Sequence, residues 1–109
     1  MREWNARAAA EDLVQALRRD GWDLSEPRYV THDVSAPTED KAEAVAADLR
    51  KTGYVVEVGG YDPDRDRWEL EAREGTKMVV TGESLIAAVD QVDRILKRRA
   101  SLSGIGVAV

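Results

Sequence analysis

The feature that most constrains the fold is the alternation of apolar and charged residues in "RWELEARE", residues 67–74. Trp68, Leu70 and Ala72 share one side of an extended chain, and Arg67, Glu69, Glu71 and Arg73 share the other. A period of two residues predicts a β-strand with one face on an apolar core and one face in water. The sheet that contains this strand must therefore be covered on one face and open on the other.

Three amphipathic helices are available to cover the apolar face. The first is predicted over about residues 5–20, and its apolar positions are spaced by three or four residues: Ala10, Leu13, Val14 and Leu17. A second is predicted to begin after Thr38, and a third to run from about Ser84 to Arg99. Each helix has a mainly one-sided apolar stripe, so each must pack against another element.

Two further strands are predicted before the one at 67–74. "RYVTHDV" (28–34) alternates, and "YVVEV" (54–58) is rich in β-branched residues. The Gly, Asp and Pro residues of 59–66 predict the loop of a long hairpin. The short apolar tail, 101–109, fits either a fourth strand at the edge of the sheet or a frayed chain end.

The order of these elements predicts an α+β fold. It is a ferredoxin-like two-layer sandwich with an antiparallel sheet, helices on one face and an extra N-terminal helix. In this arrangement the first and third strands are neighbours at the centre of the sheet. Because 109 residues are enough for one core, residues 1–109 are expected to form a single domain.

Two similar segments predict how the first two helices end. "LRRDGWDL" (17–24) and "LRKTGYVV" (49–56) each close a helix. Gly21 and Gly53 are expected in the left-handed conformation of a Schellman motif, where the next residue packs back on the last turn. This shared local geometry explains the similarity without an ancestral duplication.

Composition excludes several classes of site. The chain has 16 basic and 21 acidic residues, no cysteine and one histidine. Disulfides, thiolate chemistry, cysteine-based zinc sites and histidine-cluster sites are therefore excluded. The net charge of −5 disfavours a general nucleic-acid binder. No segment approaches the roughly 20 apolar residues of a membrane span, and we expect a soluble, cytoplasmic protein of bacterial type.

A pair of catalytic carboxylates is the first alternative for the charged face. Glu69 and Glu71 are about 7 Å apart by strand rise, near the separation used in glycoside hydrolysis. Arg67 and Arg73 flank them, however, and an open sheet face supplies no pocket that excludes water. We therefore expect a solvated charged face and no enzyme.

Metal binding is also disfavoured. Asp62, Asp64 and Asp66 imitate the first half of a calcium loop, but Arg67 and Arg73 stand where the glycine and the last glutamate are needed. His32 has no second histidine and is expected on the core side of its strand. No metal and no cofactor are predicted.

Direct RNA binding is disfavoured because the chain has no phenylalanine and Glu69 and Glu71 face outward. The one basic concentration is assigned to the last turns of the third helix, where cations suit the helix dipole. It consists of Arg94, Lys97, Arg98 and Arg99.

Three segments resemble a known family. They are the opening helix with "LVQALRRDGWDLSEPRYVTHDV", the second helix with "AVAADLRKTGYVVEV", and the Trp68 strand followed by the last helix. Across residues 10–99 they are similar to the RraB family (regulator of ribonuclease E activity B) of bacterial ribonuclease E inhibitors. The family usually ends its last helix in a Tyr-Asp-Gly-Trp motif, and here "RRASLSGIGVAV" stands instead.

The resemblance implies a ferredoxin-like fold and a non-enzymatic protein that binds and inhibits an RNA-processing endoribonuclease. Its acidic surface would compete for basic or RNA-binding segments of the partner. We expect that surface on the open sheet face, at Tyr29, Thr31, Asp33, Glu57, Arg67, Glu69, Glu71 and Arg73. The alternative is a dimerising or small-molecule-sensing domain of the same fold, with homodimers formed through the tail 101–109.

Overall fold

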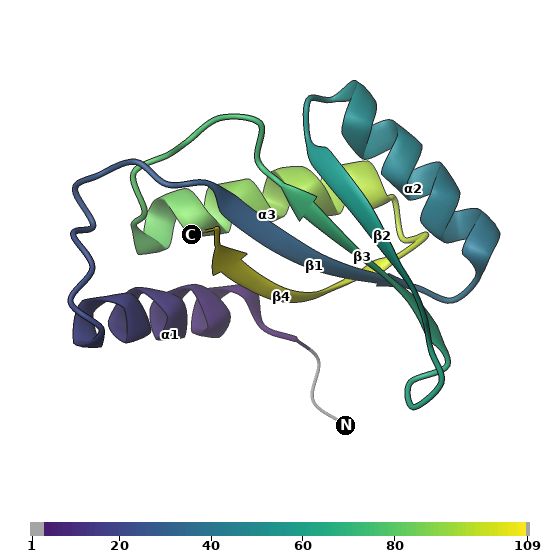
Figure 1. Cartoon of the computed structure of the whole chain (residues 1–109), viewed down its shortest axis with the longest axis horizontal. Coiled ribbons are helices and arrows are strands. Elements are labelled where there is room, and N and C mark those ends of the chain that lie inside the picture. Colours follow the sequence, from purple (N-terminus) through teal and green to yellow (C-terminus); the bar gives the residue numbers. More distant parts are fainter. Residues whose placement is uncertain (1–3, 109) are drawn as a thin grey trace.

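The computed structural model describes residues 4–108 and contains three helices and four strands (Figure 1). In chain order they are α1 (Ala6–Arg19), β1 (Val30–Ala36), α2 (Glu39–Lys51), β2 (Val55–Asp62), β3 (Arg67–Arg73), α3 (Gly82–Leu96) and β4 (Ser101–Val107). The strands form one antiparallel sheet in the order β2-β3-β1-β4. This confirms the predicted α+β sandwich with β1 and β3 at its centre.

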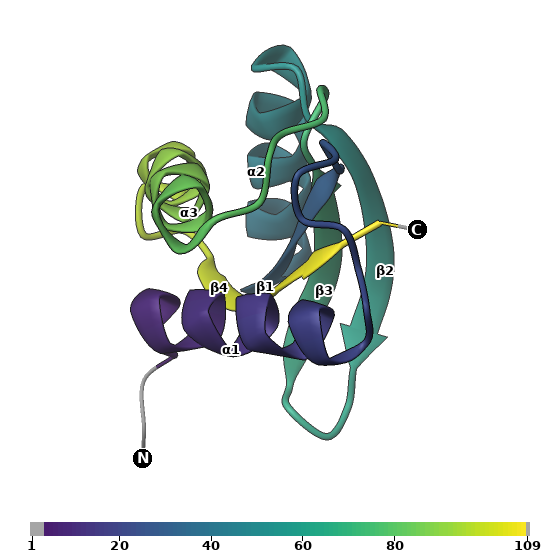
Figure 2. The same cartoon turned by 90° about the vertical axis from the view of Figure 1, so that its left-hand side faces the viewer.

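The helices lie on one side of the sheet (Figures 1 and 2). α2 packs over β2 and β3, while α1 packs against α3 and against β4. No described helix covers the opposite face. The one-sided cover follows from the alternation in the strands, which directs most of their apolar residues to the helices; Val55, at the start of β2, is exposed on the open face.

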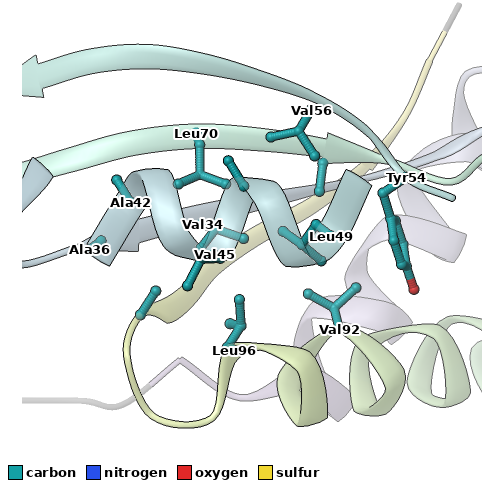
Figure 3. Close-up of a cluster of buried hydrophobic side chains, with 13 residues drawn as sticks. Val34, Ala36, Ala42, Val45, Leu49, Tyr54, Val56, Leu70, Val92 and Leu96 are labelled. Carbon is teal, nitrogen blue, oxygen red and sulfur yellow. The ribbon is translucent and has the colours of Figure 1, made fainter. Parts of the chain in front are cut away.

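The core between the layers has two apolar clusters. The larger one, drawn in Figure 3, joins α2 and α3 to the central strands and includes Val34, Val45, Leu49, Leu70 and Leu96. The smaller one joins α1 to the start of α3 and β1, and its buried members are Ala10, Val14, Leu17, Val30, Val80 and Leu85. Ile105 and Val107 pack against the second cluster, so residues 101–107 of the tail form an edge strand.

The first two helices end as predicted. Gly21 and Gly53 have φ of 81° and 103°, in the left-handed region that favours glycine. The Trp22 amide donates to the Leu17 carbonyl at 3.0 Å, and the Tyr54 amide donates to the Leu49 carbonyl at 3.1 Å. These are the six-to-one bonds of the Schellman motif.

Three predicted boundaries were wrong. β2 continues through Asp62, because its extension pairs with β3 past a bulge between Val58 and Gly60. The turn is therefore shorter than the predicted loop 59–66. α3 begins at Gly82 because Thr81 and Ser84 form a capping box, in which the side-chain oxygen of each residue accepts the backbone amide of the other. The helix ends at Leu96.

The end of α3 changes the place of the basic cluster. Lys97 and Arg98 follow the helix with φ of 50° and 63°, so they form a left-handed turn and do not belong to the last helical turn. Arg99 donates to the carbonyls of Leu96 and Ile95, at 3.0 and 2.7 Å, and covers the end of the helix. Of the described helices, none is long and apolar enough to cross a membrane.

Trp68 is only partly buried, although it lies on the core side as predicted. It packs at the margin of the larger cluster and against Tyr61, with ring centroids 5.5 Å apart. The cost of removing its side chain is therefore expected to be lower than the roughly 3–5 kcal/mol of a fully buried tryptophan.

Candidate functional site

The open sheet face carries a row of three carboxylates. Glu57 on β2 is paired with Glu71 on β3, and Glu71 is paired with Asp33 on β1. Residues that face each other across neighbouring strands lie about 4.5–5.5 Å apart at their Cα atoms, with side chains on the same face. Like charges in this position repel each other. The sequence predicted the shared face, and the register adds that the three acids are direct neighbours.

A shallow hollow of about 410 Å³ lies along this row. It is lined by Asp33, Glu57, Gly59, Arg65, Glu69, Leu70, Glu71 and Ser103. The bulge at Gly59 leaves no side chain beside Glu69, and a Cβ added at that glycine would lie 3.6 Å from the Glu69 backbone carbonyl. Four of the eight lining residues are acidic, and Arg65 is the one basic residue among them.

The four acids of the hollow, Asp33, Glu57, Glu69 and Glu71, take part in no ion pair with any residue in the range 4–108. One carboxylate oxygen of Glu69, Oε1, is shielded from solvent and accepts no hydrogen bond within that range. A shielded acceptor without a donor is costly, more so when it carries charge. The acids are also too dispersed to hold a metal ion, since no such group occurs among the described side chains. The arrangement suits several separate cations better than one ion.

The neighbouring strand β4 leaves room for Asp33 because it has glycine there. Gly104 is paired with Asp33, and a Cβ on Gly104 would lie 2.7 Å from Asp33 Oδ2. Gly106 stands beside Thr31 in the same way, with the hydroxyl 3.2 Å from such a Cβ. These two glycines were not among the predicted site residues. Their spacing of two within an apolar strand is the available signal, because it puts both on one face.

Two predicted site residues are held by their own chain. Arg67 Nε donates to the Ser35 hydroxyl at 3.2 Å, and Arg67 Nη2 donates to the Ser35 carbonyl at 2.8 Å. Arg73 lies over the ring of Tyr29, with its Cζ 4.2 Å from the ring centroid. These two cations flank the acidic row and do not neutralise it by contact.

The guanidinium of Arg73 therefore covers one face of the Tyr29 ring. Lys77 Nζ also approaches the ring, at 5.5 Å from its centroid. A cation over an aromatic ring is stabilised by the ring quadrupole, so an arginine from a partner would have to compete with Arg73. Asp33, Glu57 and Glu71 are exposed, whereas Tyr29 is partly buried, so these three acids are the most accessible part of the predicted surface.

His32 lies inside the core, as predicted, and is fully buried. Its Nε2 is 3.8 Å from Glu74 Oε2, and neither ring nitrogen has a hydrogen-bond partner in the described chain. Burial, with the carboxylate of Glu74 nearby, raises the pKa of Tyr54, whose ring is 6.3 Å from the imidazole. Because no solvent reaches His32, it cannot meet a substrate.

The aspartates of the hairpin serve the turn. The Asp64 amide donates to Asp62 Oδ1 at 3.0 Å, and the Tyr61 hydroxyl donates to Asp66 Oδ1 at 2.6 Å. The second bond raises the pKa of Tyr61. These local bonds use the oxygens that a calcium loop would direct inward.

The acidic face lies almost wholly in the part of the chain that is similar to known proteins. A family model described as "Regulator of ribonuclease activity B" matches residues 7–100, which include β1, β2 and β3. No curated protein matches the chain. Because the family model covers well over half of the sequence, the chain belongs to the RraB family of regulators of ribonuclease activity.

Proposed function

We propose that this protein is a non-enzymatic regulator that binds an endoribonuclease of the ribonuclease E type and inhibits it. The observation that carries the proposal is the row formed by Glu57, Glu71 and Asp33. Three adjacent like charges repel one another and destabilise the sheet, and a partner that places cations beside them would relieve this repulsion on binding. The family description supports a ribonuclease as that partner.

The proposed contact surface is the open sheet face around the acidic hollow. Its members are Tyr29, Thr31, Asp33, Glu57, Arg67, Glu69, Glu71 and Arg73. The exposed carboxylates of Glu57 and Glu71 support a cationic donor in the partner, since an arginine or lysine side chain could pair with them. Binding of basic segments that otherwise hold RNA would lower the rate of RNA cleavage.

The matching experiment measures cleavage of an RNA substrate by purified ribonuclease E at increasing concentrations of this protein. Charge reversal by Glu69→Lys and Glu71→Lys, separately, should weaken inhibition at least about tenfold, since close interfacial charge pairs are worth more than about 1.4 kcal/mol. Glu43→Lys is the matched control, because Glu43 is exposed on α2, on the helix side. Equal inhibition by all four proteins, or none by the wild type, would contradict the proposal.

Pairing through the tail has weaker support. α1 packs against β4, and Ile105 and Val107 point into the core, so little apolar surface of β4 is left for a second copy. Sedimentation over a range of concentrations distinguishes a monomeric regulator from a dimer.

A further inference from the structure

The two edges of the sheet differ in how they are protected. β4 has α1 packed against it, whereas β2 is the outermost strand on the other side and has no strand beyond it in the described chain (Figures 1 and 2). β2 has eight residues and contains neither lysine nor proline, the usual protections of an exposed edge. The bulge in its second half is its one backbone irregularity.

The hydrogen bonds of the central strands show which backbone groups of β2 point outward. The Glu74 amide donates to the Val30 carbonyl at 2.8 Å. The backbone groups of successive residues point to opposite sides of a strand, so Glu74 and Ala72 both direct their N–H and C=O groups toward β1. Glu71, one residue along, directs its groups toward β2. Its partner Glu57 therefore faces β3, and the residues on either side of Glu57 face away from the sheet.

A side-chain contact agrees with this assignment. Arg50 on α2 donates from Nη2 to the Val56 carbonyl at 2.9 Å, which is an outward-facing acceptor. The outward groups of Val58 have no partner within residues 4–108. One flexible arginine therefore covers one acceptor of an edge that is otherwise open.

The two faces of β2 at this edge differ in chemistry. Glu57 lies on the open face and is the outermost member of the acidic row. Val58 and Tyr61 lie on the helix face, opposite Leu70 and Trp68, and are still 36% and 48% exposed. An added strand would thus meet Glu57, with Val55 beside it, on the open face and the uncovered apolar groups of Val58 and Tyr61 on the helix face.

We propose that the β2 edge receives an extended segment of the ribonuclease, which adds to the sheet as an antiparallel strand. The segment alternates basic residues, which lie toward Glu57 and the acidic row, with apolar residues, which lie toward Val58 and Tyr61. Arg50 leaves the Val56 carbonyl, which then accepts a backbone amide of the segment. This inference rests on the proposed function and adds the manner of binding.

A synthetic peptide tests the backbone contacts. The probe alternates arginine and valine and matches the eight residues of β2 in length. Two derivatives carry N-methyl groups, one on the valine amides and one on the arginine amides. In an antiparallel pair, residues that exchange hydrogen bonds share a face, so the valine amides point at β2.

The unmodified peptide and the arginine-methylated peptide should bind the wild-type protein with similar affinity by calorimetry. The valine-methylated peptide should lose at least about tenfold, the effect of one or two hydrogen bonds. Its charge and composition are the same, so simple charge attraction predicts no difference. Equal affinity of the two methylated peptides, or no binding of the unmodified one, would overturn strand addition. The proposed function is judged separately by inhibition of intact ribonuclease E.

A pair of variants tests the role of Arg50. Arg50→Met should raise affinity for the unmodified peptide severalfold, because the Val56 carbonyl no longer has to be uncovered. Lys51→Met removes the same charge from the neighbouring position, and Lys51 has no hydrogen bond to β2. Equal effects of the two substitutions would mean that Arg50 does not protect the edge and would count against the inference.

Discussion

Replacement of Glu71 by glutamine should stabilise the free protein. Glu71 is the middle member of the acidic row, so its carboxylate has a like charge on both sides, Glu57 and Asp33. The substitution removes both repulsions and keeps the size of the side chain. The proposed partner would lose a contact by the same change, so stability and binding should move in opposite directions.

The expected magnitude follows from the cross-strand geometry. Two unit charges about 6 Å apart in water repel by about 0.7 kcal/mol, and measured cross-strand pairs fall at about 0.2–1 kcal/mol each. Loss of two such contacts should raise the free energy of unfolding by about 0.4–2 kcal/mol. In a domain of this size a gain of about 1 kcal/mol raises Tm by about 4–8 °C.

Thermal denaturation at low and high salt measures this effect. At about 1 M salt the Debye length falls to about 3 Å, so the advantage of Glu71→Gln should largely disappear. Glu43→Gln, on the exposed side of α2, should change Tm little at either salt concentration. Equal or lower stability of Glu71→Gln at low salt would refute the inference that the row is under repulsion.

Three further predictions concern the scaffold. Because burial raises the pKa of Tyr54 in the folded state, its contribution to stability is complete below its unfolded pKa of about 10 and is lost as the pH rises above that value. Tyr54→Phe should therefore flatten the fall in unfolding free energy above about pH 10, and an unchanged slope would contradict this. Gly75→Ala should lower the unfolding free energy, measured by denaturant titration, by about 1–3 kcal/mol, because the new Cβ would clash with the backbone carbonyl of Gly53. Gly82 has open space around it, so Gly82→Ala should be neutral or stabilising in the same measurement. Gly104→Ala should displace the Asp33 carboxylate, so a double-mutant cycle with Asp33→Ala should give a coupling energy of about 0.5 kcal/mol or more, and additive effects would show that the two residues do not interact.

The sequence predicted those features that depend on local chemistry. Alternation at 67–73 predicted which side of β3 faces the core, and Gly21 and Gly53 predicted two helix ends, because glycine is the usual residue in the left-handed position after a helix. α3 ends differently: Lys97 and Arg98 adopt positive φ without glycine, so composition gave no signal of the end.

The features that the sequence did not predict depend on strand pairing. The extension of β2 through Asp62 requires its bulged register with β3. The place of Gly104 beside Asp33, and the bond of Arg67 to Ser35, join residues far apart in the chain. The register also places the outward acids of three strands directly beside one another, and the periodicity within a single strand cannot predict which residues pair across strands.

The most direct test of the acidic face as the partner surface is an NMR titration of this protein with ribonuclease E. The largest changes in amide chemical shift should occur in β1, β2 and β3, centred on Asp33, Glu57 and Glu71. They should weaken with Glu71→Lys and persist with Glu43→Lys. Changes confined to the outer surfaces of α2 and α3, with the sheet unaffected, would contradict the account.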